Sequence, residues 1–118
     1  MHKHLETAFV GYQQLGLDFS DYLRWHLAHG GVATSPKFVC VVRPVNHSHP
    51  SGYNIKEPDA VFIEFVSCDK GHWDFLFDWM HSLYPYDNIY FNRMFKGHKN
   101  IRGPFPMKRV HNLLKGTE

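Results

Sequence analysis

The sequence predicts an α+β fold in which a mixed, mainly antiparallel sheet is flanked by helices, in the order α-α-β-β-β-α-β-β-α. Segments with apolar residues at helical spacing alternate with short runs rich in β-branched residues. Tight turns between successive strands favour antiparallel pairs, and the strand–helix–strand unit at 59–95 can place its two strands parallel or splayed. With 118 residues, 43% of them hydrophobic, the chain is expected to form one domain over residues 1–118.

Two helices are expected first. The first covers about residues 3–15, where apolar residues recur at helical spacing: Leu5, Ala8, Phe9, Tyr12 and Leu15. The second repeats the pattern from Phe19 to Leu27, and Gly30 and Gly31 end it.

Three strands follow. The stretch "GVATSPKFVCVVRPV" predicts a short strand, a turn at Ser35-Pro36 and a strong strand over 37–45. Residues 46–58 are polar and rich in Pro, Gly, Ser and Asn, which predicts a loop. Residues 59–68 are apolar on both faces except at Glu64, so this strand is expected at the centre of the sheet.

A helix over about 72–84 is expected next, with Asp69 as its N-cap and Pro85 after it. Residues 88–95 then predict a strand, "KGHKN" a turn, and 100–103 a short strand. The last helix is expected to carry Pro106 in its first turn and to end at Gly116.

The cysteines and the apolar segments indicate the compartment in which the protein is expected. Cys40 and Cys68 lie 28 residues apart in apolar runs, a spacing that fits neither a disulfide scaffold nor a zinc motif. Buried, reduced thiols and a cytoplasmic location are expected. No segment approaches the roughly 20 apolar residues of a membrane span, and no signal peptide is apparent, so no membrane partner is expected.

Charge is distributed unevenly. The formal net charge is +2, but residues 1–87 carry −4 and residues 88–118 carry +6. This asymmetry indicates a cationic surface for a phosphate-bearing ligand, a nucleic acid or an acidic partner. Aromatic residues between the cations can stack on single-stranded bases, although a solvated basic face explains the same pattern. The candidate anion-binding residues are Arg93, Lys96, Lys99 and Arg102.

No known nucleophile motif, P-loop or dinucleotide fingerprint occurs. His26 and His29 lie one helical turn apart, but a metal needs further ligands. We expect His26 to pack near the core, His29 to be exposed, and no structural metal. The turn in "SCDKGHWD" has the position of an anion-binding loop, with Lys70, Gly71 and His72 at its centre. Asp69 and Asp74 flank it, and both would repel an anion.

The stretch "YLRWHLAHGGVATSPKFVCVVRPV" resembles a small family of GNAT-like proteins of bacteria and their viruses. In that family a helix ending in "WHL.HG" runs into a strand ending in "RPV", here Trp25-His26-Leu27, His29-Gly30 and Arg43-Pro44-Val45. The likeness covers about residues 17–115. A weaker resemblance, to toxin-activating lysine acyltransferases, lies in the pattern of apolar and aromatic residues over 76–93.

The resemblance implies a GNAT-like fold and transfer of an acyl group from acyl-CoA to an amine. It implies Glu64 as general base. His72, by its own place at the turn into the helix, can bind phosphate when protonated or shuttle a proton as a catalytic residue. The donor would lie against Val66, Ser67, Lys70, Gly71 and His72.

The chain departs from the family in two places. Trp73 stands where a small residue is expected, and the helix that often supplies a tyrosine acid is not apparent. The alternatives are therefore a non-catalytic GNAT-like binding or virion-associated protein, or a nucleic-acid-binding module. Whether the protein is an enzyme, its substrate and its oligomeric state are left open. Glu64 can equally pair with Arg43 or Arg93 on a partly exposed sheet face, and His72 can be a solvent-facing turn residue.

Overall fold

The structure is a computed structural model that describes residues 3–14, 19–95 and 98–116. The expected α+β class and element order are confirmed. The elements are α1 (Lys3–Gln14), α2 (Phe19–Ala28), β1 (Val32–Ser35), β2 (Phe38–Val45), β3 (Ala60–Cys68), α3 (Trp73–Leu83), β4 (Asn88–Phe95), β5 (His98–Pro106) and α4 (Met107–Gly116). Among the described residues, no helix combines the length and apolar character that crossing a membrane requires.

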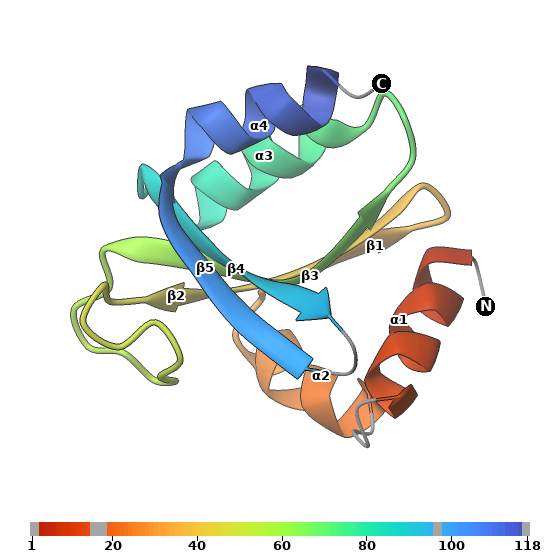
Figure 1. Cartoon of the computed structure of the whole chain (residues 1–118), viewed down its shortest axis with the longest axis horizontal. Helices are drawn as coiled ribbons and strands as arrows, with labels where there is room; N and C mark the ends of the chain where they lie inside the picture. Colours follow the sequence, from red (N-terminus) through yellow and green to blue (C-terminus); the bar gives the residue numbers. More distant parts are fainter. Residues whose placement is uncertain (1–2, 15–18, 96–97, 117–118) are drawn as a thin grey trace.

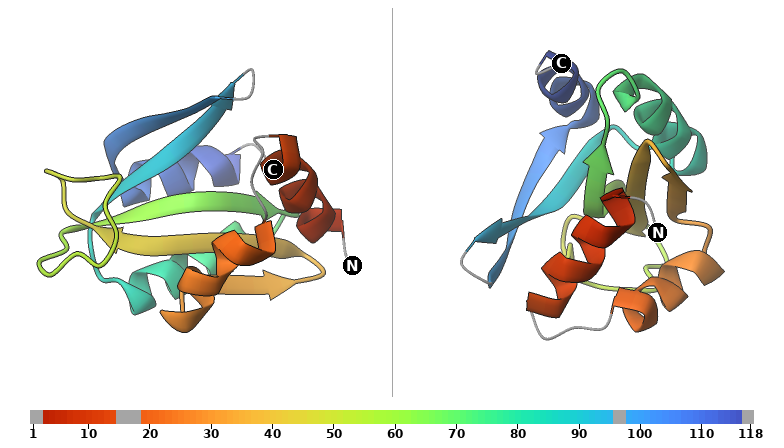
Figure 2. Two further views of the ribbon diagram at one scale, coloured as in Figure 1. Left: turned by 90° about the horizontal axis from the view of Figure 1, so that it is seen from below. Right: turned by 90° about the vertical axis from the view of Figure 1, so that its right-hand side faces the viewer.

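The five strands form one sheet in the order β1-β2-β3-β4-β5 (Figure 1). Neighbouring strands are antiparallel except β3 and β4, which are parallel because α3 carries the chain back across the sheet between them. Helices α3 and α4 cover one face, and α1 and α2 cover the other (Figures 1 and 2).

The largest core lies between the sheet and α3. Leu76, Phe77 and Met80 recur along one side of α3 and are buried against the sheet. Every residue of β2 except Pro44, which is half-buried, is buried, as expected for a strand that helices cover on both faces. The sheet residues of this core include Cys40, Val42, Val61, Ile63 and Ile89.

A glycine sets how α2 approaches β2. A side chain at Gly31 would place its Cβ 2.1 Å from the carbonyl oxygen of Val42. The same two residues are joined by a hydrogen bond from Val42 N–H to Gly31 O of 2.8 Å. The β2–β3 register shifts between Val41 and Val42, so Gly31 fits against the bulge at this point. Only glycine permits this contact.

Strands β3 and β4 separate soon after they meet. Their described pairing joins Val61, Phe62 and Ile63 to Ile89, Tyr90 and Phe91 and extends no further. Strand β4 stays paired with β5 instead, as far as Phe95 and His98. The β4–β5 hairpin therefore reaches away from the first three strands (Figure 2).

Three local predictions were wrong. The second strand of the hairpin spans His98–Pro106, not 100–103, because nearly the whole of β4 pairs with it. Pro106 ends β5 instead of beginning α4. The N-cap of α3 is His72 and makes no side-chain capping bond. Asp69 is engaged with α1 instead.

Candidate functional site

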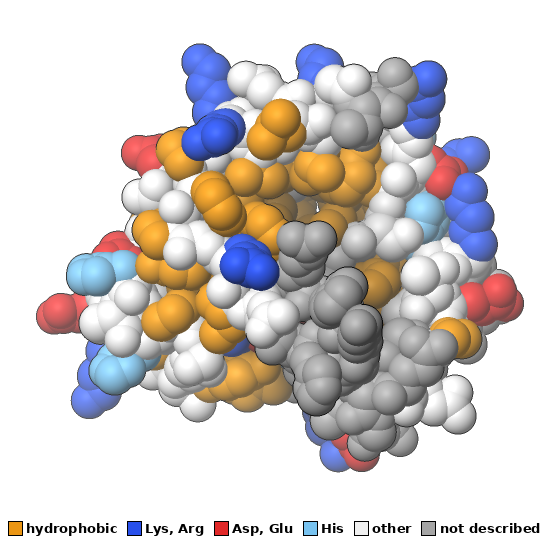
Figure 3. All heavy atoms as spheres, viewed as in Figure 1, with side chains coloured by type: hydrophobic (Ala, Val, Ile, Leu, Met, Phe, Trp, Pro, Cys, Tyr) orange, Lys and Arg blue, Asp and Glu red, His pale blue; other side chains and the backbone are white. Residues whose placement is uncertain are grey.

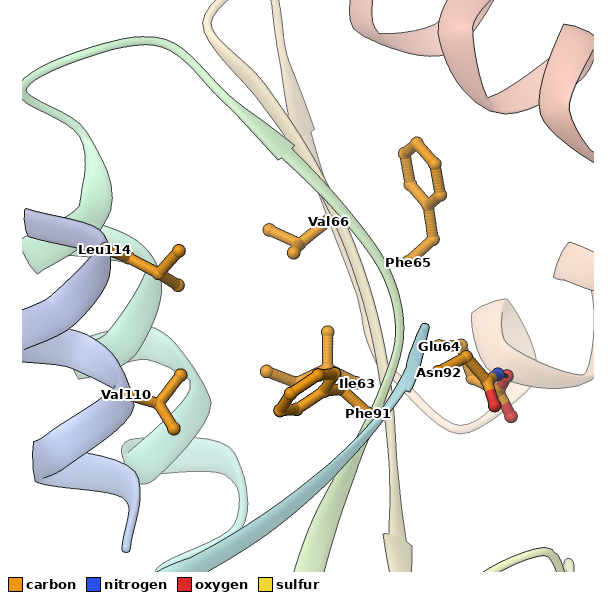
Figure 4. Close-up of a pocket in the computed structure, with 8 residues that line it drawn as sticks. All are labelled: Ile63, Glu64, Phe65, Val66, Phe91, Asn92, Val110 and Leu114. Atoms are coloured by element: carbon orange, nitrogen blue, oxygen red, sulfur yellow. Dashed lines mark hydrogen bonds between the residues drawn. The ribbon is translucent and has the colours of Figure 1, made fainter. Parts of the chain in front are cut away.

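A cleft opens where β3 and β4 diverge. Its volume is about 280 Å³, and β3, β4 and α4 line it with largely apolar side chains. Figure 4 shows Ile63, Val66 and Phe91 on the side of Val110 and Leu114, with Glu64, Phe65 and Asn92 on the other side of the sheet. The cleft therefore passes between the strands, because no ladder of hydrogen bonds closes them here.

The cleft continues toward the surface beside α4. A second cavity of about 230 Å³ shares Phe91, Val110 and Leu114 with the first and adds Phe105, Arg109 and Leu113. Leu113 is 62% exposed. Hydrophobic side chains gather on this face between α4 and β5, with Lys and Arg side chains around them (Figure 3). The two cavities therefore adjoin each other at Phe91, Val110 and Leu114.

Glu64 lies at the polar end of the cleft and is buried. Its Oε1 accepts a hydrogen bond from Arg43 Nε at 2.5 Å and one from the Tyr53 hydroxyl at 3.2 Å. Its Oε2 accepts from Asn92 Nδ2 at 3.1 Å, which spans the gap from β4 to β3. His26 Nε2 is 4.0 Å from Oε1. The sequence offered Arg43 as a partner of Glu64, and the structure makes that pair on a buried, not a partly exposed, face. A role as general base stays a prediction.

Arg43 joins this cluster to the loop at 46–58. Its guanidinium donates to the carbonyl oxygens of Gly52 and Pro50, the latter at 3.4 Å. It also lies over the rings of Tyr53 and Phe62, 4.2 and 4.4 Å from their centroids. Such cation–π contacts add to the ion pair in a buried site. The loop is thus fastened to the same charge cluster that ends the cleft.

The turn after β3 holds three of the predicted donor-binding residues. Gly71 has a φ of +90°, a conformation that favours glycine, and both Gly71 and Lys70 are exposed. His72 is half-buried and begins α3 as its N-cap. The His72 side chain makes no capping hydrogen bond, and the N-terminus of α3 directly follows the turn.

The acids beside this turn are paired with cations. Asp69 contacts Lys3 Nζ at 2.7 Å and His4 Nε2 at 2.9 Å. The hydrogen bond from Lys3, then that from His4, lowers the pKa of the Asp69 carboxyl. Asp74 likewise contacts Lys115 at 3.0 Å and His111 at 2.7 Å, and hydrogen bonds from these residues lower its pKa. The repulsion expected of both acids toward an anion is therefore reduced.

Ser67 makes a hydrogen bond with His4 that the sequence did not predict. Its Oγ is 2.5 Å from His4 Nδ1, and His4 Nε2 is 2.9 Å from Asp69 Oδ1. His4 is buried although it stands near the beginning of the first helix. No motif signals this cluster, since 63 residues separate His4 from Ser67. Val66, the preceding residue, lines the cleft from the same strand.

The predicted anion-binding residues lie on the β4–β5 hairpin. Arg102 is exposed and pairs in register with Phe91. Arg93 stands opposite Asn100, and Lys99 opposite Met94. Lys96 falls outside the described residues, as do the side chains of Arg93 and Lys99.

The cysteines and histidines show no metal cluster in the described part of the chain. Cys40 is buried, and burial raises the pKa of its thiol well above the ordinary range. Cys68 is half-buried, and both thiols are free. His26 is buried and His29 exposed, as predicted. His29 stacks on Trp25, with 3.9 Å between ring centroids.

Comparison with protein-family models, with curated proteins and with solved structures gave no match for this chain. The function must therefore be inferred from the residues of the cleft and of the turn beside it.

Proposed function

We propose that this protein is acyltransferase-like and binds an acyl-CoA-type donor, whose thin arm lies in the cleft between β3 and β4. The observation that carries the proposal is the divergence of these parallel strands after three paired residues. A largely apolar cleft of about 280 Å³ between two strands suits an extended thioester arm better than a bulky ring system.

The main chain of β3 supplies polar groups for such an arm. Asp69 N–H donates to Lys37 O at 2.7 Å, and Phe38 is opposite Cys68 in the β2–β3 register. Hydrogen bonds alternate sides along an antiparallel pair, so the N–H and C=O of Val66 point away from β2 and toward the opening. These groups can bond the amides of an extended donor as a neighbouring strand would.

The turn at residues 70–72 suits the phosphates of the donor. Lys70 brings an exposed cation, and Gly71 lets the main chain approach a ligand closely. The N-terminus of α3 adds N–H groups and the positive end of the helix dipole. Trp73, half-buried at the first position of the helix, narrows this site compared with a turn of small residues.

Binding measurements test the proposal. Calorimetry and thermal unfolding should be run with coenzyme A, with a long-chain acyl-CoA and with the matching free fatty acid. A ligand present at ten times its dissociation constant stabilises the fold by about 1.4 kcal/mol. We expect acyl-CoA to bind most tightly, because it fills both the cleft and the turn. A folded protein that none of these compounds stabilises would exclude the proposed function.

A pair of variants on α4 locates the binding. Val110→Phe places a ring in the cleft, whereas Asn112→Phe adds the same ring at an exposed position of the same helix. We expect Val110→Phe to weaken acyl-CoA binding about tenfold or more, a loss of about 1.4 kcal/mol. Asn112→Phe should bind as the wild type does. Equal affinities for the two variants would place the ligand elsewhere.

A further inference from the structure

A side chain of α1 and two side chains at the end of β3 form a chain of hydrogen bonds. Ser67 belongs to β3, Asp69 to the turn that follows it, and His4 to α1. The imidazole lies between the other two, 2.5 Å from the serine Oγ and 2.9 Å from the aspartate Oδ1. A nucleophile bonded to a base, which is bonded in turn to an acid, is the arrangement that activates a serine.

The ionisation of Asp69 fixes the direction of these bonds. Lys3 and His4 lower the pKa of this carboxyl, so it is ionised at neutral pH and only accepts hydrogen bonds. His4 Nε2 must then carry the hydrogen that Asp69 accepts. In the neutral imidazole the other nitrogen, Nδ1, is an acceptor, and it receives the hydroxyl hydrogen of Ser67. The two ring nitrogens have exchanged the places they take in serine proteases, but the direction of proton flow is the same.

Burial holds the imidazole in this orientation. The His4 side chain is 7% exposed and that of Asp69 23% exposed, so solvent reaches the acid more readily than the base. Lys3 approaches the same Oδ1 at 2.7 Å and holds the carboxylate in place. Ser67 is partly exposed and stands two residues after Phe65, so it lies on the face of β3 from which Phe65 lines the cleft. Its hydroxyl meets His4 on the α1 side of the sheet and does not itself line the cleft.

We propose that Ser67 is a nucleophile that accepts the acyl group of a thioester or ester, with His4 as its base and Asp69 as the residue that positions His4. The Ser67 oxygen forms a bond to the carbonyl carbon while the carbon–sulfur bond breaks. The hydroxyl proton moves to His4 Nδ1 and then to the leaving thiolate. An amine or a water molecule next attacks the ester on Ser67 and gives its proton to His4, which passes that proton to the Ser67 oxygen as the acyl–oxygen bond breaks.

This inference relies on the proposed function for the donor, but not for the reactivity of the serine. Glu64 is already bonded to Arg43, Tyr53 and Asn92, whereas His4 receives a hydroxyl hydrogen directly. Ser67, three residues after Glu64 on β3, is thus a hydroxyl already bonded to a base, His4 of α1.

A fluorophosphonate probe tests the serine directly, since it phosphonylates activated serine hydroxyls and releases fluoride. Labelling should be followed by intact mass, and the site found by peptide fragmentation. We expect one adduct, on Ser67. Ser67→Ala should remove it, and His4→Gln should slow labelling about 100-fold or more. Ser51→Ala, an exposed serine of the loop at 46–58, is the matched control and should label as the wild type does.

The variants separate a reactive cluster from a merely structural one. If the three residues only fasten α1 to the sheet, His4→Gln will lower the melting temperature while the wild type stays unlabelled, and the proposal is then wrong. Labelling of another residue, or labelling that His4→Gln leaves unchanged in a folded protein, also overturns it. If Ser67→Ala still binds acyl-CoA and the probe leaves the wild type unlabelled, the proposed donor site stands and the proposed nucleophile is wrong. If the probe labels Ser67 but the protein does not bind acyl-CoA, the nucleophile stands and the proposed function is wrong.

Discussion

The buried pair between Arg43 and Glu64 allows a quantitative test of how the polar end of the cleft is held. Arg43→Met keeps most of the side-chain volume but removes the cation. Both side chains of the pair are 3% exposed, so the Glu64 carboxylate would stay buried without its cation, while Tyr53 and Asn92 still donate to it. Breaking a buried pair in this way costs about 3–5 kcal/mol. This is a large part of the 5–15 kcal/mol by which a typical domain is stable.

Urea and thermal unfolding, followed by circular dichroism, measure this loss. At about 4 °C per kcal/mol for a chain of this size, Arg43→Met should melt about 12–20 °C below the wild type. Arg24→Met is the control, because Arg24 pairs with Asp21 on an exposed helix surface where such bridges contribute about 0–1 kcal/mol.

A second change shows whether the buried carboxylate without its Arg43 cation causes the loss of stability. Adding Glu64→Gln to Arg43→Met removes the carboxylate, so the double variant should be more stable than Arg43→Met alone. If Arg43→Met loses less than about 1 kcal/mol, or if the double variant is less stable than the single one, the reasoning is refuted.

Two further predictions concern backbone and surface charge. Gly31→Ala should destabilise the fold by more than Gly30→Ala in urea unfolding. Its Cβ meets the Val42 carbonyl at 2.1 Å, while Gly30, at a φ of +74°, has open space around it; equal losses would contradict the steric argument. Hydrogen bonds from Lys115 and His111 lower the pKa of Asp74 below its ordinary 3.8, so its ion pairs stabilise the fold above that pH. The stabilisation is lost as the pH falls through the lower, folded-state pKa. Asp74→Asn should therefore melt below the wild type at pH 7 and converge with it in acid; a constant difference would contradict this sign.

The order of helices and strands could be predicted because each is encoded locally. Period-3.6 and period-2 patterns are present in the segments themselves, and turn residues separate them. Glu64 stood out for the same reason, as a single charge in an apolar strand, and Arg43 could be named as a partner because it lies on the preceding strand.

The cleft could not be predicted in this way. An apolar pattern indicates that residues 88–95 form a strand, but not that the strand leaves β3 after Phe91 to follow β5. The contact of His4 with Ser67 and Asp69 was missed because it depends on where α1 packs against the sheet. Asp69 was instead taken as a helix cap, the commonest use of an aspartate before a helix. Features that depend on tertiary placement were thus the ones that sequence patterns left out.

The strand order of the sheet has a consequence for how the chain folds. Each strand pairs with its neighbour in the sequence, so the sheet forms by closing short loops and by one helical crossover. Proteins dominated by such local contacts fold quickly, because little chain entropy is lost before contacts form. The tie from α1 to β3 instead closes a loop of 63 residues. We expect the sheet to assemble first and α1 to dock late, so that the serine–histidine contact forms only once the cleft already exists.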